Sequence, residues 1–280
     1  MKNSKMRGKM RLSKKYSELT GNGLFLIAGP CVIENEKMAF ATAEKLLEIT
    51  LRLGIPFVFK ASYDKANRSS LGSYRGPGIK KGLALMAKIR KKLNVPVLTD
   101  VHETKDVVET AKAVDILQIP AFLCRQTDLV VAAAKTGKIV NIKKGQFLSP
   151  FEMDNIIKKA VSTGNKEIML TERGFSFGYN NLVVDLKSIA YMKSTGYPVI
   201  IDATHAVQRP GGAGNRSGGD REYIEPIARG AVAAGAQGVF MEVHPNPSKA
   251  MSDKDSQYAL DKVEPVLRKL KQIYDLVNRK

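Results

Sequence analysis

The sequence predicts an α/β protein that folds as a single (β/α)8 TIM barrel, and three observations support this. Eight short apolar segments occur in order along the 280 residues, and segments with helical spacing of apolar residues separate them. The apolar segments are nearly continuous and rich in Val, Ile and Phe, as strands buried on both faces are. An open doubly wound sheet would need fewer strands and an early glycine-rich phosphate loop, and no such loop follows the first segment.

The expected strands end in polar residues. The strands occupy residues 24–29, 55–59, 95–99, 116–119, 139–142, 168–171, 199–204 and 238–241. Within or just after them stand Cys31, Lys60, Asp100, His102, Gln118, Lys143, Glu172, Arg173, His205, Glu242 and His244. Because the carboxyl ends of the strands of such a barrel meet at one rim, this pattern predicts a site as well as a fold.

The expected helices fill the intervals between the strands. They occupy residues 35–52, 78–93, 104–113, 128–136, 149–163, 185–194, 221–234 and, after the last strand, 257–277. The first places Ala39, Ala43 and Leu46 on one helical face, as an amphipathic helix requires. Ser149 followed by Pro150 marks a helix start, with proline in the first helical position.

The charge distribution is strongly basic. The formal net charge is +18, and residues 1–15 contain seven Lys or Arg and no acid. We expect residues 1–20 to be a basic, solvated, mobile N-terminal arm and residues 21–280 to form the barrel. Nucleic-acid binding is one explanation of such a charge. However, the basic residues are dispersed along the sequence, aromatic residues are only 7%, and no nucleic-acid-binding motif occurs. We therefore expect an anionic small-molecule substrate and no nucleic acid.

The two cysteines, Cys31 and Cys124, are too few for a disulfide framework, which favours a reducing compartment. No apolar segment reaches the roughly 20 residues of a membrane helix. We therefore expect a cytoplasmic protein without a membrane partner. Two loops, residues 61–78 and 209–221, are long for a compact domain, and the second is rich in glycine, which favours a mobile lid over the site.

Five cations lie at or just after expected strand ends. They are Lys60, Lys65, Arg68, Lys143 and Arg173. Any one could be ordinary surface charge, but Lys60 and Lys143 follow directly from apolar strands and need partners there. A cluster of Lys and Arg on one rim is suited to a multiply charged anion.

A second group comes from the ends of the first, seventh and eighth strands and the loop that follows. It consists of Cys31, His205, Glu242 and Asp253. The first and eighth strands of a closed barrel are neighbours, so these side chains can meet. A thiolate, an imidazole and two carboxylates suit Fe²⁺, Zn²⁺, Mn²⁺ or Co²⁺. The spacing alone leaves a structural role for Cys31 and His205 open.

Asp100 and His102 point to the same face of their strand, which favours a shared site. His102 could act as a base or a hydrogen-bond donor, as could His244, and both could instead be polar residues satisfied locally. Cys124 has no partner in the pattern and is interpreted as structural.

Several motifs resemble those of the 3-deoxy-D-manno-octulosonate-8-phosphate synthase family. They are GPCVIE (29–34), KASYDKANRSS (60–70), TDVHE (99–103), NIKKGQF (141–147), ERG (172–174), FGYNNL (177–182), DATH (202–205) and EVHP (242–245). The resemblance covers residues 24 to 256. The KANRSS segment distinguishes this family from the related 3-deoxy-D-arabino-heptulosonate-7-phosphate synthases, which typically have a Lys-Pro-Arg-Thr-like segment there.

The resemblance implies condensation of phosphoenolpyruvate with arabinose 5-phosphate and water, with loss of phosphate by C–O cleavage, for lipopolysaccharide biosynthesis. It implies that one group of residues binds phosphoenolpyruvate: Lys60, Gln118, Lys143 and Arg173. Lys65 would lie between the substrates, and Asn67, Arg68 and Ser69 would bind the sugar phosphate. Arg125 would reach the sugar phosphate of a neighbouring subunit in a homotetramer. Asp100, His102, Lys65 and His205 are the catalytic candidates.

The family has a metal-dependent branch and a metal-independent branch, and the latter has Asn at the position of Cys31. Cys31 with His205, Glu242 and Asp253 therefore resembles the metal-dependent branch. Asp253 is chosen by its spacing from Glu242, and Asp255 is the alternative fourth ligand. The alternatives to the family's activity are a heptulosonate synthase that uses erythrose 4-phosphate and a basic nucleic-acid-binding module.

Overall fold

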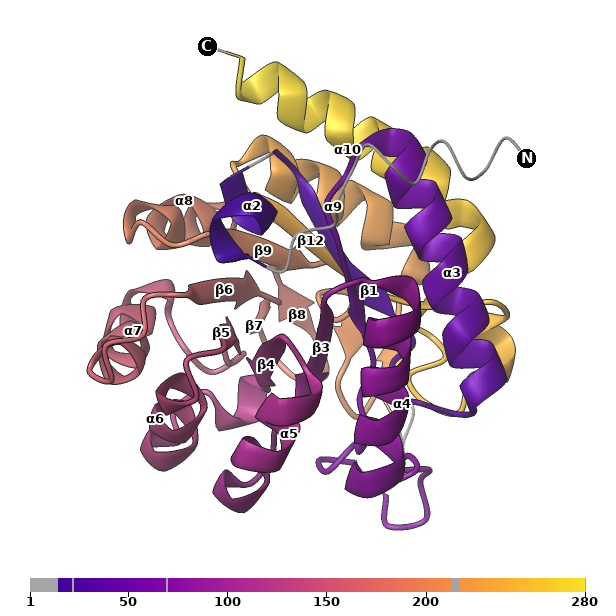
Figure 1. Ribbon diagram of the computed structural model, residues 1–280. Helices are drawn as coiled ribbons and strands as arrows, with labels where there is room; N and C mark the ends of the chain where they lie inside the picture. Colours follow the sequence, from indigo (N-terminus) through magenta and orange to yellow (C-terminus); the bar gives the residue numbers. More distant parts are fainter. Residues whose placement is uncertain (1–14, 22, 69, 213–216, 280) are drawn as a thin grey trace.

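The protein forms a closed barrel of eight parallel strands, described in a computed structural model for residues 15–21, 23–68, 70–212 and 217–279. The strands follow one another around the barrel, and the last pairs with the first (Figure 1). They are β1 (Phe25–Gly29), β2 (Phe57–Lys60), β3 (Val97–Asp100), β4 (Ile116–Ile119), β5 (Ile139–Lys143), β6 (Ile168–Glu172), β9 (Val199–Asp202) and β12 (Gly238–His244). The predicted fold class is confirmed.

Helices surround the barrel (Figure 1). They are α3 (Glu36–Leu53), α4 (Ile79–Leu93), α5 (Val107–Ala113), α6 (Thr127–Lys135), α7 (Met153–Val161), α8 (Leu186–Ser194), α9 (Ile224–Ala233) and α10 (Val263–Val277). Asn35 caps α3 by accepting a hydrogen bond from the Met38 backbone N–H. The predicted start at Ser149 is also present, as a capping box with Glu152.

The last helix begins later than predicted. Residues 257–262 are not part of it, because β13 (Tyr258–Ala259) pairs with the end of β12 and a 3₁₀ turn, Leu260–Lys262, follows. Gln257 is held by its side chain, whose Oε1 accepts from Cys31 N and whose Nε2 donates to Ser252 O. Tertiary contacts therefore override the helical pattern at this end.

Apolar side chains fill the amino-terminal half of the barrel interior. This inner cluster consists of Phe25, Ile27, Val58, Leu98, Ile116, Ile139, Met169, Ile200 and Phe240, joined by Leu19. A larger apolar layer lies between the strands and the helices. The inner cluster fills the end of the barrel at which the strands begin. Polar side chains at the carboxyl ends of the strands therefore face a space that opens at the opposite end.

Helix α2 (Tyr16–Gly21) covers the closed end (Figure 1). Leu19 is 2% exposed within the inner cluster, and Tyr16 Oη donates a hydrogen bond to Ile168 O at 2.7 Å. Residues 16–20, which the sequence analysis assigned to the arm, are thus part of the barrel. The physical reason is that Tyr16 and Leu19 share one helical face and bury it. Residues 1–14 of the predicted arm lie outside the described residues.

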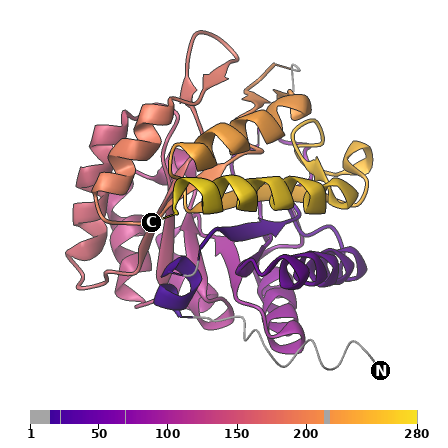
Figure 2. The same ribbon diagram turned by 90° about the horizontal axis from the view of Figure 1, so that it is seen from above.

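Two small hairpins lie beyond the carboxyl ends of the strands. One pairs β7 (Phe175–Ser176) with β8 (Leu182–Val183), and it projects at the end opposite to α2 (Figure 2). The other pairs β10 (Gln208–Arg209) with β11 (Gly218–Gly219) in the predicted lid, of which residues 213–216 lie outside the described residues. Among the helices described, none is long and apolar enough to cross a membrane.

Candidate functional site

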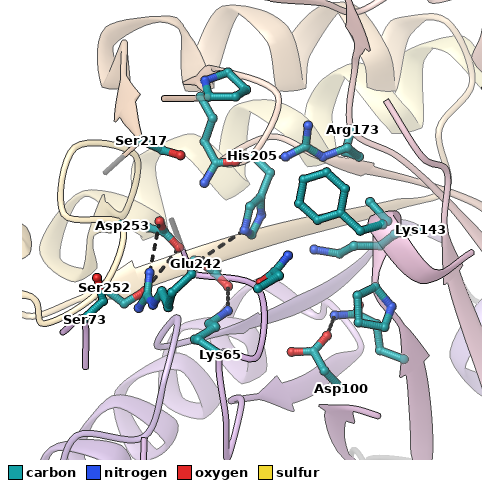
Figure 3. Close-up of a pocket in the computed structure, with 18 of the residues that line it drawn as sticks. Lys65, Ser73, Asp100, Lys143, Arg173, His205, Ser217, Glu242, Ser252 and Asp253 are labelled. Carbon is teal, nitrogen blue, oxygen red and sulfur yellow. Dashed lines mark hydrogen bonds and ion pairs between the residues drawn. The ribbon is translucent and has the colours of Figure 1, made fainter. Parts of the chain in front are cut away.

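A cavity of about 460 Å³ opens at the carboxyl ends of the strands, where the sequence predicted a site. Its lining includes most of the predicted residues (Figure 3). These are Lys60, Lys65, Asn67, Arg68, Asp100, His102, Gln118, Lys143, Arg173, His205, Glu242 and Asp253. Cys31 is not among the lining residues, but its Sγ lies 3.0 Å from Asp253 Oδ2. Ser69 lies outside the described residues.

One half of the cavity is cationic and comes from β2, β5 and β6. Lys60, Lys143 and Arg173 are each at most 6% exposed. Burial lowers the pKa of Lys143 and of Arg173, because a charge is costly away from water. Arg173 Nη1 and Arg68 Nη2 are buried without a hydrogen-bond partner among the described residues. Buried guanidinium nitrogens of this kind indicate a site that an anion completes.

A chain of hydrogen bonds joins side chains on four neighbouring strands and orients Gln118. Thr171 Oγ1 donates to Asn141 Oδ1, Asn141 Nδ2 to Gln118 Oε1 at 2.8 Å, and Gln118 Nε2 to Asp100 Oδ1 at 2.5 Å. Each residue stands on the next strand around the barrel, so the chain joins β6, β5, β4 and β3. It fixes the direction of both Gln118 and Asp100.

Asp100 is ionised in this surrounding. Burial alone raises its pKa, but the nearby Lys60 and Lys65 ammonium groups outweigh burial, and the pKa lies well below its usual range. Ser62 Oγ donates to its second oxygen. Next to it, burial lowers the pKa of His102, which favours a neutral imidazole that can accept a proton.

The other half of the cavity contains the predicted metal-binding residues. Cys31 Sγ lies 3.0 Å from Asp253 Oδ2. The ligand atoms of Cys31, Glu242 and Asp253 all lie within 4.8 Å of one another. His205 Nε2 lies 3.5 Å from Glu242 Oε2, at the edge of this group. A thiol, two carboxylates and an imidazole converging from β1, β9, β12 and the loop after β12 fit a divalent transition metal.

Asp202 lies against His205, accepting a hydrogen bond from its backbone N–H at 2.9 Å, while His205 Nδ1 has no hydrogen-bond partner among the described residues. Asp202 Oδ2 lies 2.7 Å from His205 Nδ1, and Nε2 of the same ring is directed toward Glu242. The same Oδ2 lies 2.5 Å from Lys143 Nζ. Burial raises the pKa of Asp202, but His205 and Lys143 outweigh it and lower the pKa overall. One buried carboxylate thus connects the cationic half to the candidate metal-binding half.

Burial and nearby charges shift the pKa values of Cys31 and of Glu242 in opposite directions. Burial raises the pKa of the Cys31 thiol well above its ordinary value, and the Asp253 and Glu242 carboxylates add to this. Burial acts to raise the pKa of Glu242 too, but Lys60 at 2.5 Å and Lys65 at 3.3 Å bring it well below its usual range. A bound cation would favour the thiolate form of Cys31.

Between the two candidate fourth ligands, the structure brings Asp253 to the site. Asp253 has a left-handed backbone with φ of +46°, and this turn directs its side chain to Cys31 and to Arg68 Nη1, 3.6 Å from its Oδ1. Asp255 is neither among the cavity-lining residues nor in the group of converging ligand atoms.

Three residues singled out in the sequence lie apart from the cavity. Arg125 is exposed and does not line it. Cys124 is buried in the outer apolar layer, in line with a structural role. His244 Nδ1 accepts from Asn246 N, whereas its Nε2, 3.4 Å from Glu34 Oε1, is buried without a hydrogen-bond partner among the described residues.

Sequence reasoning assigned no role to several residues that shape the site. Asp202 is the most central, and a buried acid at the end of an apolar strand could have indicated it. Gln208 Oε1 accepts from Arg173 Nη2 at 2.9 Å, and Gln146 and Phe122 line the cavity. Gln146 stands in a turn, Phe122 in a 3₁₀ turn and Gln208 in the short strand β10, segments too short for hydrophobic periodicity to give a signal.

Comparisons with known proteins agree with this geometry. Residues 9–279 match the DAHP synthetase I family. A protein of Geobacter sp. (strain M21) is 57% identical over 259 residues, which are 92% of this chain and 95% of that protein. One of Acidithiobacillus ferrooxidans is 58% identical over 253 residues, 90% of each chain. One of Desulfotalea psychrophila is 56% identical over 254 residues, 91% of each chain. All three are named 2-dehydro-3-deoxyphosphooctonate aldolase.

Proposed function

This chain belongs to the DAHP synthetase I family, and from that premise we propose that it condenses phosphoenolpyruvate with D-arabinose 5-phosphate and water. The products are 3-deoxy-D-manno-octulosonate 8-phosphate and inorganic phosphate. The observation that carries the proposal is the identity of 56–58% over at least nine-tenths of the chain with proteins named 2-dehydro-3-deoxyphosphooctonate aldolase. The cavity supports it, because three anionic groups on two substrates need the cations that line it.

Phosphoenolpyruvate is assigned to the cationic half. Lys60, Lys143 and Arg173 are buried and face the cavity, and Gln118 is fixed beside them by its hydrogen bonds. Arg173 can bind a phosphate or carboxylate through two nitrogens, whereas each lysine acts as a point charge. The unpaired Arg173 Nη1 supports this assignment.

The sugar phosphate is assigned to the loop after β2. Asn67 and Arg68 line the cavity there, and Arg68 Nη2 is buried without a partner among the described residues. Lys65 lies between the two halves, with Nζ 3.3 Å from Glu242 Oε1. Holding both substrates in attack geometry contributes several kcal/mol through proximity alone.

In the proposed reaction, C3 of phosphoenolpyruvate forms a bond to the aldehyde carbon of the sugar. The aldehyde oxygen takes a proton, and Lys65 Nζ is the donor placed between the substrates. Water adds to C2, the C2–O bond to the phosphate breaks, and the new C2 hydroxyl becomes the ketone as its proton passes to the departing phosphate. The neutral imidazole of His102 accepts the proton that the water loses, and the Asp100 carboxylate stabilises the imidazolium that forms.

We further propose that Cys31, His205, Glu242 and Asp253 hold a divalent metal ion, Fe²⁺, Zn²⁺, Mn²⁺ or Co²⁺, as in the metal-dependent branch. A bound ion of this kind supplies Lewis-acid chemistry, by polarising a carbonyl or lowering the pKa of a water. The convergence of the ligand atoms of Cys31, Glu242 and Asp253 supports the assignment, as does His205 Nε2 at 3.5 Å from Glu242 Oε2. Because Cys31 must stay reduced to bind a metal, the proposal includes a reducing, cytoplasmic compartment.

We propose a homotetramer in which Arg125 serves a neighbouring active site. Arg125 is exposed, and Phe122 nearby is 51% exposed while lining the cavity. Phe177 and Tyr179 on the projecting β7–β8 hairpin are 70% and 98% exposed. Large exposed aromatic side chains are typical of surfaces that other chains cover.

An assay of phosphate release from phosphoenolpyruvate with each of two sugars tests the function. The proposal expects turnover with arabinose 5-phosphate and none of comparable rate with erythrose 4-phosphate. Turnover with the four-carbon sugar only would instead identify a heptulosonate synthase. Salt-sensitive DNA binding without phosphate release would identify a nucleic-acid-binding module.

A further inference from the structure

Two charged residues lie directly behind the phosphoenolpyruvate half without facing it. Lys144 follows Lys143 at the end of β5, and Glu172 precedes Arg173 at the end of β6. Lys144 is 2% exposed and Glu172 is 1% exposed, and neither lines the cavity. Because consecutive side chains alternate across a strand, Lys143 faces the interior and Lys144 the opposite side.

The two charges meet and hold backbone groups of both strand ends. Lys144 Nζ lies 3.5 Å from Glu172 Oε1 and donates to Leu148 O at 3.2 Å. Glu172 Oε1 accepts from the backbone N–H groups of Arg173 and Gly174, at 3.0 and 2.7 Å. Its Oε2 accepts from Ser188 Oγ at 2.6 Å. The pair therefore fixes the turn that carries Arg173 and the loop that follows Lys143.

Such a pair is not explained by stability. Removing two charges from water costs several kcal/mol, and apolar residues of the same volume often serve as well. A buried pair of this kind is expected where a particular geometry has to be kept. Here the neighbours are Lys143 and Arg173, two buried cations that line the same cavity.

We propose that Lys144 and Glu172 are positioning residues, a buried clasp between β5 and β6 that holds Lys143 and Arg173 in the register that binds phosphoenolpyruvate. The inference rests on the proposed function for the identity of the ligand. It concerns neither the metal-binding group nor the sugar half.

The test is calorimetric titration of phosphoenolpyruvate into the wild-type holoenzyme, Lys144→Met and Glu172→Gln, together with KM for both substrates. Each variant should raise the Kd for phosphoenolpyruvate about tenfold, as expected for misplaced binding groups, and leave KM for arabinose 5-phosphate within about twofold. Asp115→Asn is the matched control. Asp115 is a buried carboxylate that pairs with Arg90 and accepts from Val97 N, at the opposite end of the barrel. It should lose comparable thermal stability without losing phosphoenolpyruvate affinity.

A milder variant keeps the test decisive if the charge changes prevent folding. Ser188→Ala removes one hydrogen bond to Glu172 and should raise the Kd for phosphoenolpyruvate about threefold. Unchanged affinity in folded Lys144→Met, Glu172→Gln and Ser188→Ala, or an equal loss in Asp115→Asn, would overturn the clasp. A wild-type protein that binds phosphoenolpyruvate but releases no phosphate with the sugar would overturn the proposed function instead.

Discussion

Cys31 Sγ lies 3.0 Å from Asp253 Oδ2, although 222 positions separate the two residues in the chain. Closure of the barrel brings β1 beside β12, and the loop after β12 folds back over the end of β1. Ser252 Oγ, 2.7 Å from the same sulfur, lies in that loop. The contact brings together a thiol and a carboxylate, two of the four residues that we propose as metal ligands.

Substituting Cys31 by Asn should weaken metal binding. The amide is a poor ligand for a transition metal and removes the only sulfur of the group, so affinity should fall at least about tenfold. Competition with a metallochromic chelator measures this without recourse to activity. Cys124→Ala is the matched control, because Cys124 is buried outside the site and its loss should leave metal affinity unchanged. Equal affinity in wild type and Cys31→Asn would remove the thiol from the ligand set.

Asp202→Asn should impair both halves of the cavity at once. The substitution removes the charge that pairs with Lys143 and lies 2.7 Å from His205 Nδ1, so KM for phosphoenolpyruvate should rise and metal affinity should fall. Leaving Lys143 without its buried counter-charge should also lower the free energy of unfolding by about 3 kcal/mol. Urea unfolding and metal titration of the same preparation measure both. Loss of stability with intact metal affinity and KM would contradict the shared role.

The affinity for phosphoenolpyruvate should fall at alkaline pH. Burial lowers the pKa of Lys143 below the 10.5 of an ordinary lysine, and only the protonated side chain attracts the anion. Binding is therefore complete below the lowered pKa and weakens as the pH rises through it, so KM should climb at a lower pH than the one at which an ordinary lysine loses its charge. Lys143→Arg keeps a charge throughout this range and should flatten the profile. A rise of the same steepness in Lys143→Arg would assign the titration to another group.

Arg125→Ala should affect the sugar phosphate alone. If Arg125 reaches a neighbouring subunit, its loss removes a charge-assisted contact, and KM for arabinose 5-phosphate rises about tenfold. KM for phosphoenolpyruvate should stay within about twofold, since the proposal assigns that substrate to Lys60, Lys143 and Arg173 of one chain. Steady-state kinetics with each substrate varied in turn measure the difference. No change in either KM would separate Arg125 from the site.

The sequence was sufficient to predict the barrel, because buried parallel strands leave continuous apolar segments. The same segments also placed three residues at the rim of the barrel, because each of them ends or follows an apolar segment. These residues are Lys60, Lys143 and His205. The start of α10 and the fold of residues 16–20 could not be predicted, because Gln257 and Leu19 are determined by contacts with distant residues. Asp202 belongs to a motif that the sequence shows, but its contacts with both Lys143 and His205 could not be predicted. They depend on how the ends of β5 and β9 lie relative to each other in the folded barrel.

The most direct test of the account is phosphate release from phosphoenolpyruvate and arabinose 5-phosphate before chelation, after exhaustive chelation, and after adding back Fe²⁺, Zn²⁺, Mn²⁺ or Co²⁺ singly. We predict activity in the untreated protein, its loss on chelation, and its recovery with at least one of the four ions. Full activity in a chelated protein that contains no metal by elemental analysis, or no phosphate release under any condition, would contradict it.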